Sequence, residues 1–250
     1  MNRKFLLIGL MLIIAASVYS QTPSASELLR RVDENGIYSS IQYDGDMIIE
    51  YGGRRYVKTM KAWARGNTQS FIEFTNSEDR GTKYLKTGGR LYVYSPDNEG
   101  VMLISGHMLR ESMMGSDMSY EDTMDNETLS SRYNPVLSGS EVIESFGGRR
   151  DTWVLDLAAK SRTESYPARK LWIDKENGDL LHYELFALSG AKLKEHTILK
   201  VEVIGGRRFP VEARTRDLSR RDSKTVFIMR NVALDKPIAD SVFSTRNLER

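Results

Sequence analysis

The chain has 250 residues and no cysteine, and it carries 36 lysines and arginines against 34 aspartates and glutamates. The absence of cysteine excludes disulfides, thiolate nucleophiles and cysteine metal ligands. The near balance of charge excludes the broad basic face that nucleic-acid binding requires. A chain of this length is sufficient for one hydrophobic core, and we expect a single domain over residues 21–250.

The first 20 residues have the features of a secretory signal peptide. Arg3 and Lys4 precede a short apolar run, and Val18 and Ser20 are small enough for the positions that signal peptidase reads. The apolar run is shorter than the roughly 20 residues that span a bilayer, which disfavours the alternative of an uncleaved membrane anchor. We therefore predict cleavage after Ser20 and a soluble periplasmic protein with 34 basic and 34 acidic residues, since Arg3 and Lys4 are lost.

One short helix is predicted directly after the signal peptide. Ser24 is a suitable N-cap, and Gly36 stands where a C-terminal cap is expected. Between them the apolar residues Leu28, Leu29 and Val32 recur at helical spacing. The sequence therefore predicts an amphipathic helix between these two caps.

A Gly-Gly-Arg sequence recurs between β-rich runs, where a two-residue hairpin turn needs positive φ at both central positions. Asn177-Gly178 predicts a fifth hairpin in the same way. We interpret the arginines as charges that shield strand ends. The alternative is one shared docking site for an anionic partner. The four Gly-Gly-Arg sequences are residues 52–54, 88–90, 147–149 and 205–207.

Apolar and polar residues alternate along the predicted strands, which assigns one face of each strand to an apolar interior. The opposite positions carry Lys, Glu, Arg and Thr, as in an antiparallel sheet with one dry and one wet face. The pattern predicts a mainly β (α+β) fold in which a large antiparallel sheet curls around the interior. The expected interior residues are Ser70, Ile72, Phe74, Trp153, Leu155, Leu157, Leu181, Tyr183, Leu185, Leu199, Val201, Val203, Phe209, Val211 and Ala213.

The segment from Ser105 to Tyr133 lacks this alternation and is rich in methionine. Ser119 and Asp122 have the spacing of a helix capping box. We predict short helices and loops across the open side of the sheet, forming a lid with few fixed contacts when the cavity is empty. Methionine adapts to guests of variable shape; the alternative is that these methionines seal a permanent core. The predicted lid methionines are Met108, Met113, Met114 and Met118.

Residues that would indicate catalysis or metal binding are sparse. His107, His182 and His196 are scattered without a metal-ligand spacing, and His182 falls on the predicted polar face of its strand. The chain has no nucleophile elbow, dinucleotide fingerprint or Walker A loop. The carboxylates around Asp117 and Asp122 lack the spacing of a calcium-binding loop. We therefore predict a non-enzymatic protein without a metal or cofactor.

Three stretches carry a resemblance to a known family: Ser77–Lys86, Leu91–Pro96 and Ser112–Asp122. The last contains Met-Gly-Ser-Asp-x-Ser-Tyr-Glu-Asp, which is the most specific part. They are similar to the outer-membrane lipoprotein-sorting proteins of the LolA-like superfamily, and the resemblance extends from the first helix to Ile238–Phe243. It implies a half-open antiparallel β-barrel with short helices as a lid over an apolar cavity.

The same resemblance implies an acylated lipoprotein or another lipid as the ligand, an inner-membrane transporter as donor and an outer-membrane acceptor. A carrier fits the physical requirement, since each acyl methylene exposed to water costs about 0.8 kcal/mol. One alternative is a lipid- or lipoprotein-sensing regulator of a membrane export system on the same fold; a lipid hydrolase would need a nucleophile beside a base. We expect a monomer that binds no nucleic acid. The predicted lipid-binding residues are Ile72, Phe74, Met108, Met113, Met114, Met118, Trp153, Leu155, Leu157, Leu181, Tyr183 and Leu185.

Overall fold

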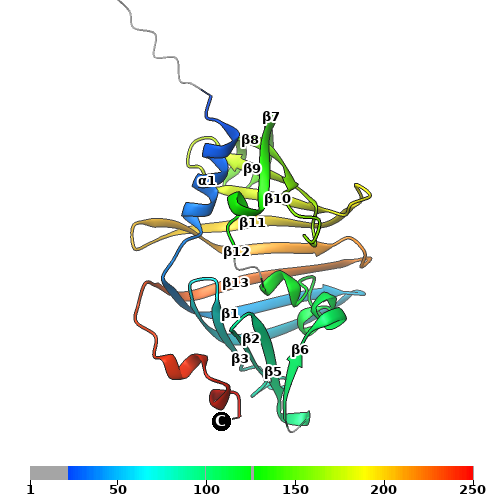
Figure 1. Ribbon diagram of the computed structural model, residues 1–250, viewed down its shortest axis with the longest axis vertical. Coiled ribbons are helices and arrows are strands. Elements are labelled where there is room, and N and C mark those ends of the chain that lie inside the picture. The colour runs from blue at the N-terminus through cyan, green and yellow to red at the C-terminus, as the bar shows by residue number, and fades with distance from the viewer. Residues whose placement is uncertain (1–21, 99, 125–126, 250) are drawn as a thin grey trace, which may run out of the picture.

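The computed structural model of the chain describes residues 22–98, 100–124 and 127–249. The predicted signal peptide, residues 1–20, therefore lies outside the described residues. Thirteen strands of the described part form one antiparallel sheet in the order β6-β5-β4-β3-β2-β1-β13-β12-β11-β10-β9-β8-β7 (Figure 1). The predicted mainly β fold is confirmed.

Long hairpin strands make up the sheet, and short helices lie in its connections. The strands are β1 (Ser40–Tyr51), β2 (Arg54–Arg65), β3 (Gln69–Phe74), β4 (Lys83–Thr87), β5 (Arg90–Ser95), β6 (Gly100–Ile104), β7 (Tyr133–Ser145), β8 (Gly148–Ala159), β9 (Ala168–Asp174), β10 (Leu180–Phe186), β11 (Lys192–Ile204), β12 (Arg207–Asp217) and β13 (Ser223–Leu234). The α-helices are α1 (Ala25–Asn35) and α2 (Leu129–Arg132), and the 3-10 helices are η1 (Pro96–Asn98), η2 (Gly106–Arg110), η3 (Met113–Gly115), η4 (Glu121–Thr123), η5 (Asp240–Phe243) and η6 (Thr245–Asn247).

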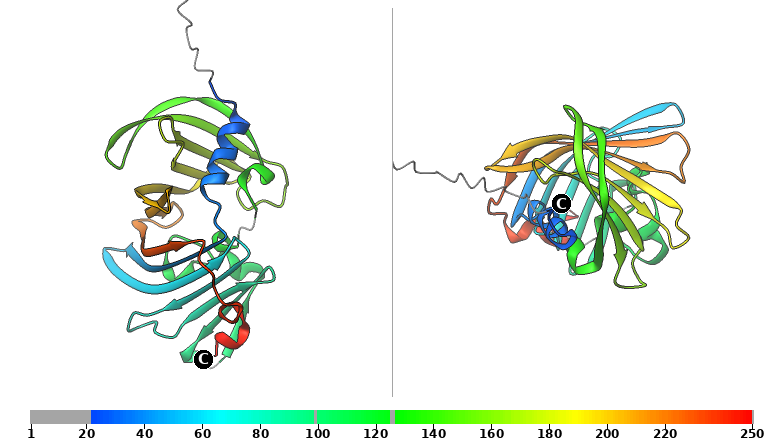
Figure 2. Two further views of the ribbon diagram at one scale, coloured as in Figure 1. Left: turned by 90° about the vertical axis from the view of Figure 1, so that its left-hand side faces the viewer. Right: turned by 90° about the horizontal axis from the view of Figure 1, so that it is seen from above.

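The strand order explains why the methionine-rich segment crosses the molecule. From β1 to β6 the chain moves outward to one edge of the sheet, and from β7 to β13 it moves inward from the other edge until β13 pairs with β1. The connection between the two edges therefore has to pass over the sheet, and it does so on the concave side (Figures 1 and 2). Residues 105–124 of this connection are named the cover here. Their predicted position across the open side is confirmed.

The sheet curls at both ends without closing, because its two edge strands, β6 and β7, do not pair with each other. Figure 2 shows the two curled ends, with α1 inside the end formed by β7–β10. The helix starts and stops where the sequence predicts. The Ser24 side chain accepts a hydrogen bond of 3.2 Å from the backbone N–H of Glu27, and Gly36 forms the C-cap. Gly36 has a φ of −86°, so this cap does not need the left-handed conformation.

The Gly-Gly-Arg sequences form hairpin turns, as predicted. Gly52 and Gly53 have φ values of 58° and 74° between β1 and β2, and residues 205 and 206 have similar values between β11 and β12. The first turn follows Tyr51, which pairs with Ser223, whereas Arg207 of the second turn donates to the carbonyl of Ile37. These positions are separated by the length of β1, roughly 35 Å. The alternative of one shared anionic site formed by all four turns is therefore wrong.

Alternation assigns the interior face correctly on β3, β8 and β12, where Phe74, Leu155 and Phe209 are buried. On β11 the assignment is wrong. The buried residues of this strand are Lys194 and Ile198, and Val203 is 67% exposed. Lys194, His196 and Ile198 share the interior face, and the predicted residues Leu199, Val201 and Val203 lie one position out of phase with them. The pairing with β12 also shifts on both sides of Lys200. Apolar character alone therefore does not identify the interior face of this strand.

The convex face is covered at one end by the C-terminal residues. Phe243 and Leu248 bury themselves against Phe71 and Leu85, whose side chains point away from the interior. The Arg65 guanidinium holds this tail by donating a hydrogen bond of 2.6 Å to the carbonyl of Ile238. The tail thus stabilises β2–β4 from outside and leaves their concave face to the cover.

Candidate functional site

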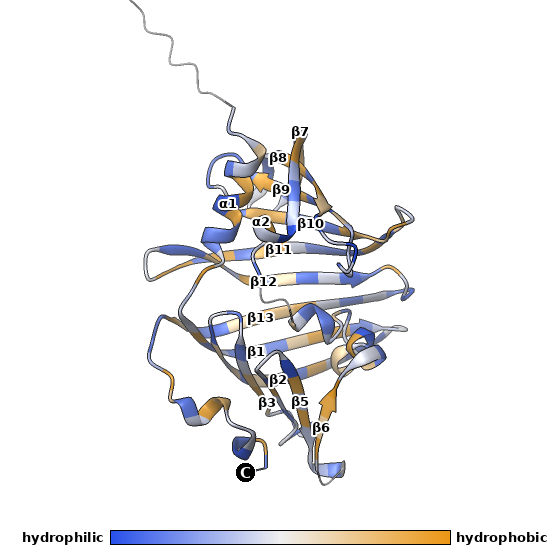
Figure 3. Ribbon diagram, viewed as in Figure 1, coloured by the Kyte–Doolittle hydropathy of each residue, from blue (hydrophilic) through white to orange (hydrophobic). Residues whose placement is uncertain are grey.

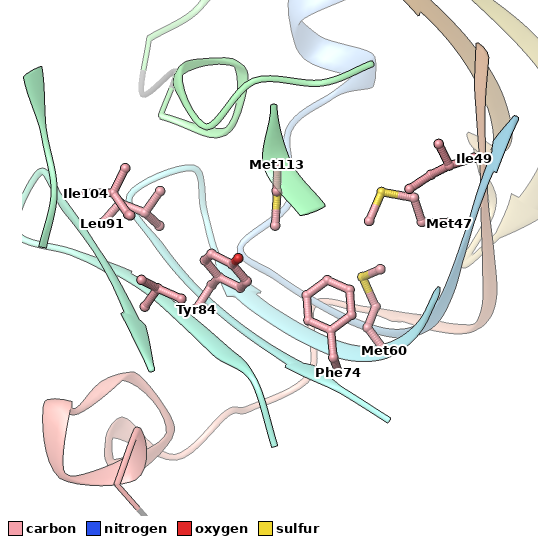
Figure 4. Packing of buried hydrophobic residues seen from close by; sticks show 9 residues of the cluster. Met47, Ile49, Met60, Phe74, Tyr84, Leu91, Ile104 and Met113 are labelled. Carbon is pink, nitrogen blue, oxygen red and sulfur yellow. The ribbon is translucent and has the colours of Figure 1, made fainter. Parts of the chain in front are cut away.

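The concave face holds two separate groups of apolar side chains. The first lies on β1–β6 under the cover and is named the cover core; Figure 4 shows its packing. Ile72, Met108 and Met114 are partly buried against it. Its buried members are Met47, Ile49, Met60, Phe74, Tyr84, Leu91, Val93, Ile104 and Met113.

The second group lies on β7–β9 and is filled by α1; it is named the helix core. Leu28 and Leu29 of the helix are 2% and 0% exposed. Trp153 and Tyr183 pack against the rim of this core. The predicted lipid-binding residues therefore do not share one core, because those of β8 contact a helix of the same chain. The buried members are Leu28, Leu29, Tyr133, Leu155, Leu157, Leu171 and Ile173.

Strand β10 departs from simple alternation. Its pairing with β9 shifts between Leu180 and His182, so that Leu180 lies opposite Ile173 and packs against the helix core. Leu181 is fully buried at this irregularity. Leu185 is buried farther along the strand, opposite Lys194 of β11. The three predicted residues on β10, Leu181, Tyr183 and Leu185, are thus buried or half-buried, but they do not form one group of contacting side chains.

A cavity of about 280 Å³ lies between the cover and the strands β1–β3 and β13. Small-ligand pockets usually measure about 300–1,000 Å³, so this one is just below that range, and a bulky ligand requires the cover to move. Three of the predicted residues, Ile72, Met113 and Met118, line it. Its apolar wall includes Met47, Met60, Ile72, Met113, Met118 and Phe227, together with aromatic and aliphatic side chains of β1 and β2.

The other two cover methionines face a different space. Met108 and Met114 line a second cavity of about 660 Å³ between the cover and β4–β6. Tyr84 also lines this second cavity, and its hydroxyl lies 3.0 Å from the sulfur of Met114. The four predicted lid methionines therefore serve two cavities, one on each side of the cover core.

The cover is held to the centre of the sheet by buried polar contacts. Asp117 is 1% exposed, and its carboxylate accepts hydrogen bonds from the Thr225 hydroxyl at 2.7 Å and the backbone N–H of Asp217 at 3.0 Å. The Arg220 guanidinium donates to the carbonyls of Gly115, at 3.0 Å, and Ser116. The expectation of a lid with few fixed contacts is wrong for this part of the cover.

A second anchor lies one turn farther along the cover. The N–H of Ser119 donates to the Asp122 carboxylate at 2.8 Å and the N–H of Asp122 to the Ser119 hydroxyl at 3.4 Å, which confirms the predicted capping box. Lys194 and the Tyr166 hydroxyl donate to the two carboxylate oxygens at 2.6 and 2.7 Å. Burial alone would raise the pKa of Asp122, but the Lys194 ammonium and these hydrogen bonds hold it below its ordinary value.

Polar side chains also occupy the interior between the two cores. His196 lies 2.7 Å from the Thr215 hydroxyl and stacks on Tyr183 at a centroid distance of 4.6 Å. Burial lowers the pKa of His196 to about 4. His182 lies on the other face of the sheet, opposite Thr197. The predicted solvent exposure of His182 is wrong, since its ring is partly buried against Trp172 and burial lowers its pKa. The interior is therefore apolar in two parts with a polar band between them.

Sequence reasoning missed the partners of the cover. Lys194 and Thr225 are polar residues in strands with charged neighbours, so alternation alone gives no reason to place them inside. Arg220 lies in a loop rich in charge. One signal was present: Asp117 and Asp122 belong to the Met-Gly-Ser-Asp-x-Ser-Tyr-Glu-Asp stretch. Acids in a segment that must cross a sheet interior need buried donors.

Within the described ranges no group of three or more histidine, aspartate or glutamate side chains could hold a metal ion. No helix in the same part of the chain is long and apolar enough to span a membrane. The predicted lack of a metal, a cofactor and a catalytic site stays a prediction.

Comparisons with known proteins identify the fold. A family model with the description "uncharacterized protein" matches residues 66–250. No curated protein matches the chain. A DUF1329 family protein from Desulfovibrio piger is 23% identical with a TM-score of 0.79, over 90% of this chain and 97% of that one.

Two further solved structures have the fold that the sequence resemblance implies. A LolA superfamily protein from Nitrosomonas europaea is 20% identical with a TM-score of 0.72, over 90% of this chain and 100% of that one. A domain described as an outer membrane lipoprotein-sorting protein, from Vibrio parahaemolyticus, is 20% identical with a TM-score of 0.73, over 90% and 97%. The half-open LolA-like fold is thus confirmed.

Proposed function

The chain belongs to the family whose model matches residues 66–250, and from its fold and interior we propose that it is a non-enzymatic periplasmic carrier of lipoproteins or another lipid. In this proposal the acyl chains occupy the 280 Å³ cavity and are passed toward the outer membrane. An inner-membrane transporter supplies the ligand, an outer-membrane acceptor receives it, and the carrier is a monomer.

The observation that carries the proposal is the apolar cavity under a methionine cover. Met113 and Met118 line it from the cover, and Met47, Met60 and Phe227 are part of the wall that the sheet contributes. Each methylene transferred from water to such a wall contributes about 0.8 kcal/mol. Methionine side chains adapt to chains of different length and branching at small cost. The description of the Vibrio domain as a lipoprotein-sorting protein supports the ligand class through the shared fold.

The anchors of the cover determine which part of it moves when a ligand larger than the cavity enters. Asp117 and Asp122 hold residues 116–122 to the sheet. The preceding backbone turns through positive φ values at Met114 and Gly115, 53° and 79°. This turn brings the N–H of Met113 to the carbonyl of Met118 at 2.8 Å, and the N–H of Tyr120 donates to the carbonyl of Glu111 at 3.2 Å. Residues 111–113 therefore stay with the anchored part, and the part that moves in this proposal is η2.

A regulator that senses lipids or lipoproteins is the second candidate, because the same cavity serves it equally well. The two functions differ in the fate of the bound ligand. A carrier releases its ligand to an acceptor and leaves it, whereas a sensor holds a protein partner in a stable complex. A pulldown of the full chain from periplasmic extract, with and without added lipid, separates them.

Native mass spectrometry of the protein purified from its own periplasm tests the proposal. We expect a mass increment that corresponds to an acylated molecule and disappears after organic extraction. The intact mass also tests the export prediction, which requires that the mature chain begin at Gln21. Ligand-free protein from cells that make it at natural levels, together with no uptake of added lipid, would contradict the carrier function.

A further inference from the structure

The larger of the two cavities beside the cover has a different chemistry from the first. It measures about 660 Å³ and lies between the cover and β4–β6, at one open edge of the sheet. Strand β6 is apolar along its length (Figure 3), and Met102 is 46% exposed there. The apolar part of the lining consists mainly of Tyr84, Val93, Met102, Ile104, Met108 and Met114.

Carboxylates surround this apolar floor. Asp79 is neutralised by Lys58, whose ammonium lies 2.6 Å from it. Glu78, Asp97 and Glu111 are exposed, and among the described residues none of the three forms a salt bridge with a basic side chain. The described lining contains no lysine or arginine. The cavity therefore combines an apolar floor with a rim of three uncompensated negative charges.

From this combination we infer that the second cavity binds a cationic amphiphile, a molecule with an alkyl chain and an ammonium or amine head. The chain lies on Met102, Ile104 and Met108, and the head faces Glu78, Asp97 and Glu111. An anionic head, such as a phosphate or fatty-acid carboxylate, is repelled by the same rim. Among the described residues, no group of three or more acids is placed to hold a metal ion.

This site is separate from the cavity of the proposed function. The cover core lies between them, with Phe74 and Met113 buried in its centre. The two cavities also differ in lining, since Ile72, Met113 and Met118 belong only to the first. The inference therefore stands independently of lipid carriage, and its failure would leave the carrier proposal untouched.

The expected selectivity is moderate, because the rim is exposed to solvent. An exposed ion pair changes affinity by about 1.5-fold to fivefold, so three carboxylates together should favour a cation by roughly tenfold. Salt reduces the effect, since the Debye length at physiological ionic strength is only about 8 Å. Binding through the alkyl chain should respond much less to salt.

Calorimetric titration of the full chain with decyltrimethylammonium and with decyl sulfate, each below its micelle concentration, tests the inference. We expect the ammonium compound to bind about tenfold more tightly at low ionic strength. The triple variant Glu78→Gln, Asp97→Asn, Glu111→Gln should abolish this preference. Met102→Ser should weaken both compounds, because it removes apolar contact without removing charge.

The matched control is Glu144→Gln, Asp151→Asn, Asp156→Asn, which removes the same net charge from exposed positions on β7 and β8. It should leave the preference for the cation intact. Equal affinities in the unmodified protein would overturn the inference, as would a preference that the control abolishes equally. A third result would also overturn the inference: Ile72→Gln weakens binding of the ammonium compound and Met102→Ser does not. The compound would then occupy the first cavity.

Discussion

The hydroxyl of Thr225, on β13 in the centre of the sheet, donates a hydrogen bond of 2.7 Å to the buried carboxylate of Asp117, in the cover. The same hydroxyl accepts from the backbone N–H of Asp117 at 2.9 Å. Two residues 108 positions apart thus satisfy each other inside the molecule. Their contact fixes the cover at the centre of the sheet, which the connection from β6 to β7 has to cross. A cavity lies on each side of the cover core.

Thr225→Val tests this anchor. The substitution keeps the shape of the side chain but leaves one oxygen of the buried Asp117 carboxylate and the Asp117 N–H without their partner, so we expect a loss of about 1–3 kcal/mol in the free energy of unfolding. Hydrogen exchange of residues 112–122 should become faster. Thr197→Val, on the opposite face of β11, is the control and should leave exchange in the cover unchanged. Unchanged hydrogen exchange of residues 112–122 in Thr225→Val would show that this contact does not hold the cover to the sheet.

Lys194→Met tests the second anchor. Lys194 and Asp122 are 10% and 19% exposed in their side chains, and removal of the lysine leaves a largely buried carboxylate unpaired. We expect a loss of about 3 kcal/mol in the free energy of unfolding. The double variant Lys194→Met, Asp122→Asn should recover part of it, because no charge then remains buried. Urea unfolding of the two variants measures the difference, and equal stability of both would contradict the account.

Acid should destabilise the protein in two steps. His196 has a folded pKa of about 4 against an ordinary value of 6.5, so the unfolded chain binds its proton first as the pH falls. The contribution of His196 to the free energy of unfolding is therefore fully present above pH 6.5. It is lost as the pH falls from 6.5 to about 4, by up to about 3 kcal/mol. His182, whose pKa is also lowered, contributes in the same direction.

Asp122 acts in a second, more acidic window. Its folded pKa is lowered, so its stabilisation is present above the ordinary aspartate value of about 3.9 and is lost as the pH falls through the folded pKa. His196→Asn should flatten the first window and leave the second. Urea unfolding midpoints at pH 7.5, 6, 5 and 4 would measure this, and the same slope in both proteins would contradict the assignment.

The elements set by local chemistry could be predicted from the sequence. Ser24 and Gly36 define α1, and paired glycines define the hairpins, because caps and turns depend on neighbouring residues alone. The interior was less predictable. Lys194 of β11 is buried inside beside Asp122 of the cover, and α1 fills the space over Leu155. Both outcomes depend on contacts between distant parts of the chain, which alternation within one strand does not encode.

Leu155→Arg distinguishes core from lining. Leu155 is 0% exposed within the helix core, so burial of an unpaired charge there should cost several kcal/mol and prevent stable folding. Ile72→Gln is the informative counterpart, because Ile72 is partly buried and lines the first cavity. It should weaken binding of acyl chains and change stability by only about 1 kcal/mol. A folded Leu155→Arg protein with normal lipid binding would show that Leu155 of β8 is needed neither for the helix core nor for the lipid site.

The most direct test of the central claim fills the first cavity. Ala64 lines it and is partly buried, so Ala64→Phe should occupy the space that an acyl chain needs. Binding is measured by the fluorescence of N-phenyl-1-naphthylamine and its displacement by monododecanoyl glycerol, an uncharged lipid. Ala191→Phe, in the exposed turn between β10 and β11, is the matched control. We predict that the lipid displaces the probe from the unmodified protein and the control, and that Ala64→Phe loses at least about tenfold in affinity while still unfolding cooperatively. Equal lipid affinity in all three proteins, or none in the unmodified chain, would contradict the claim that this cavity binds acyl chains.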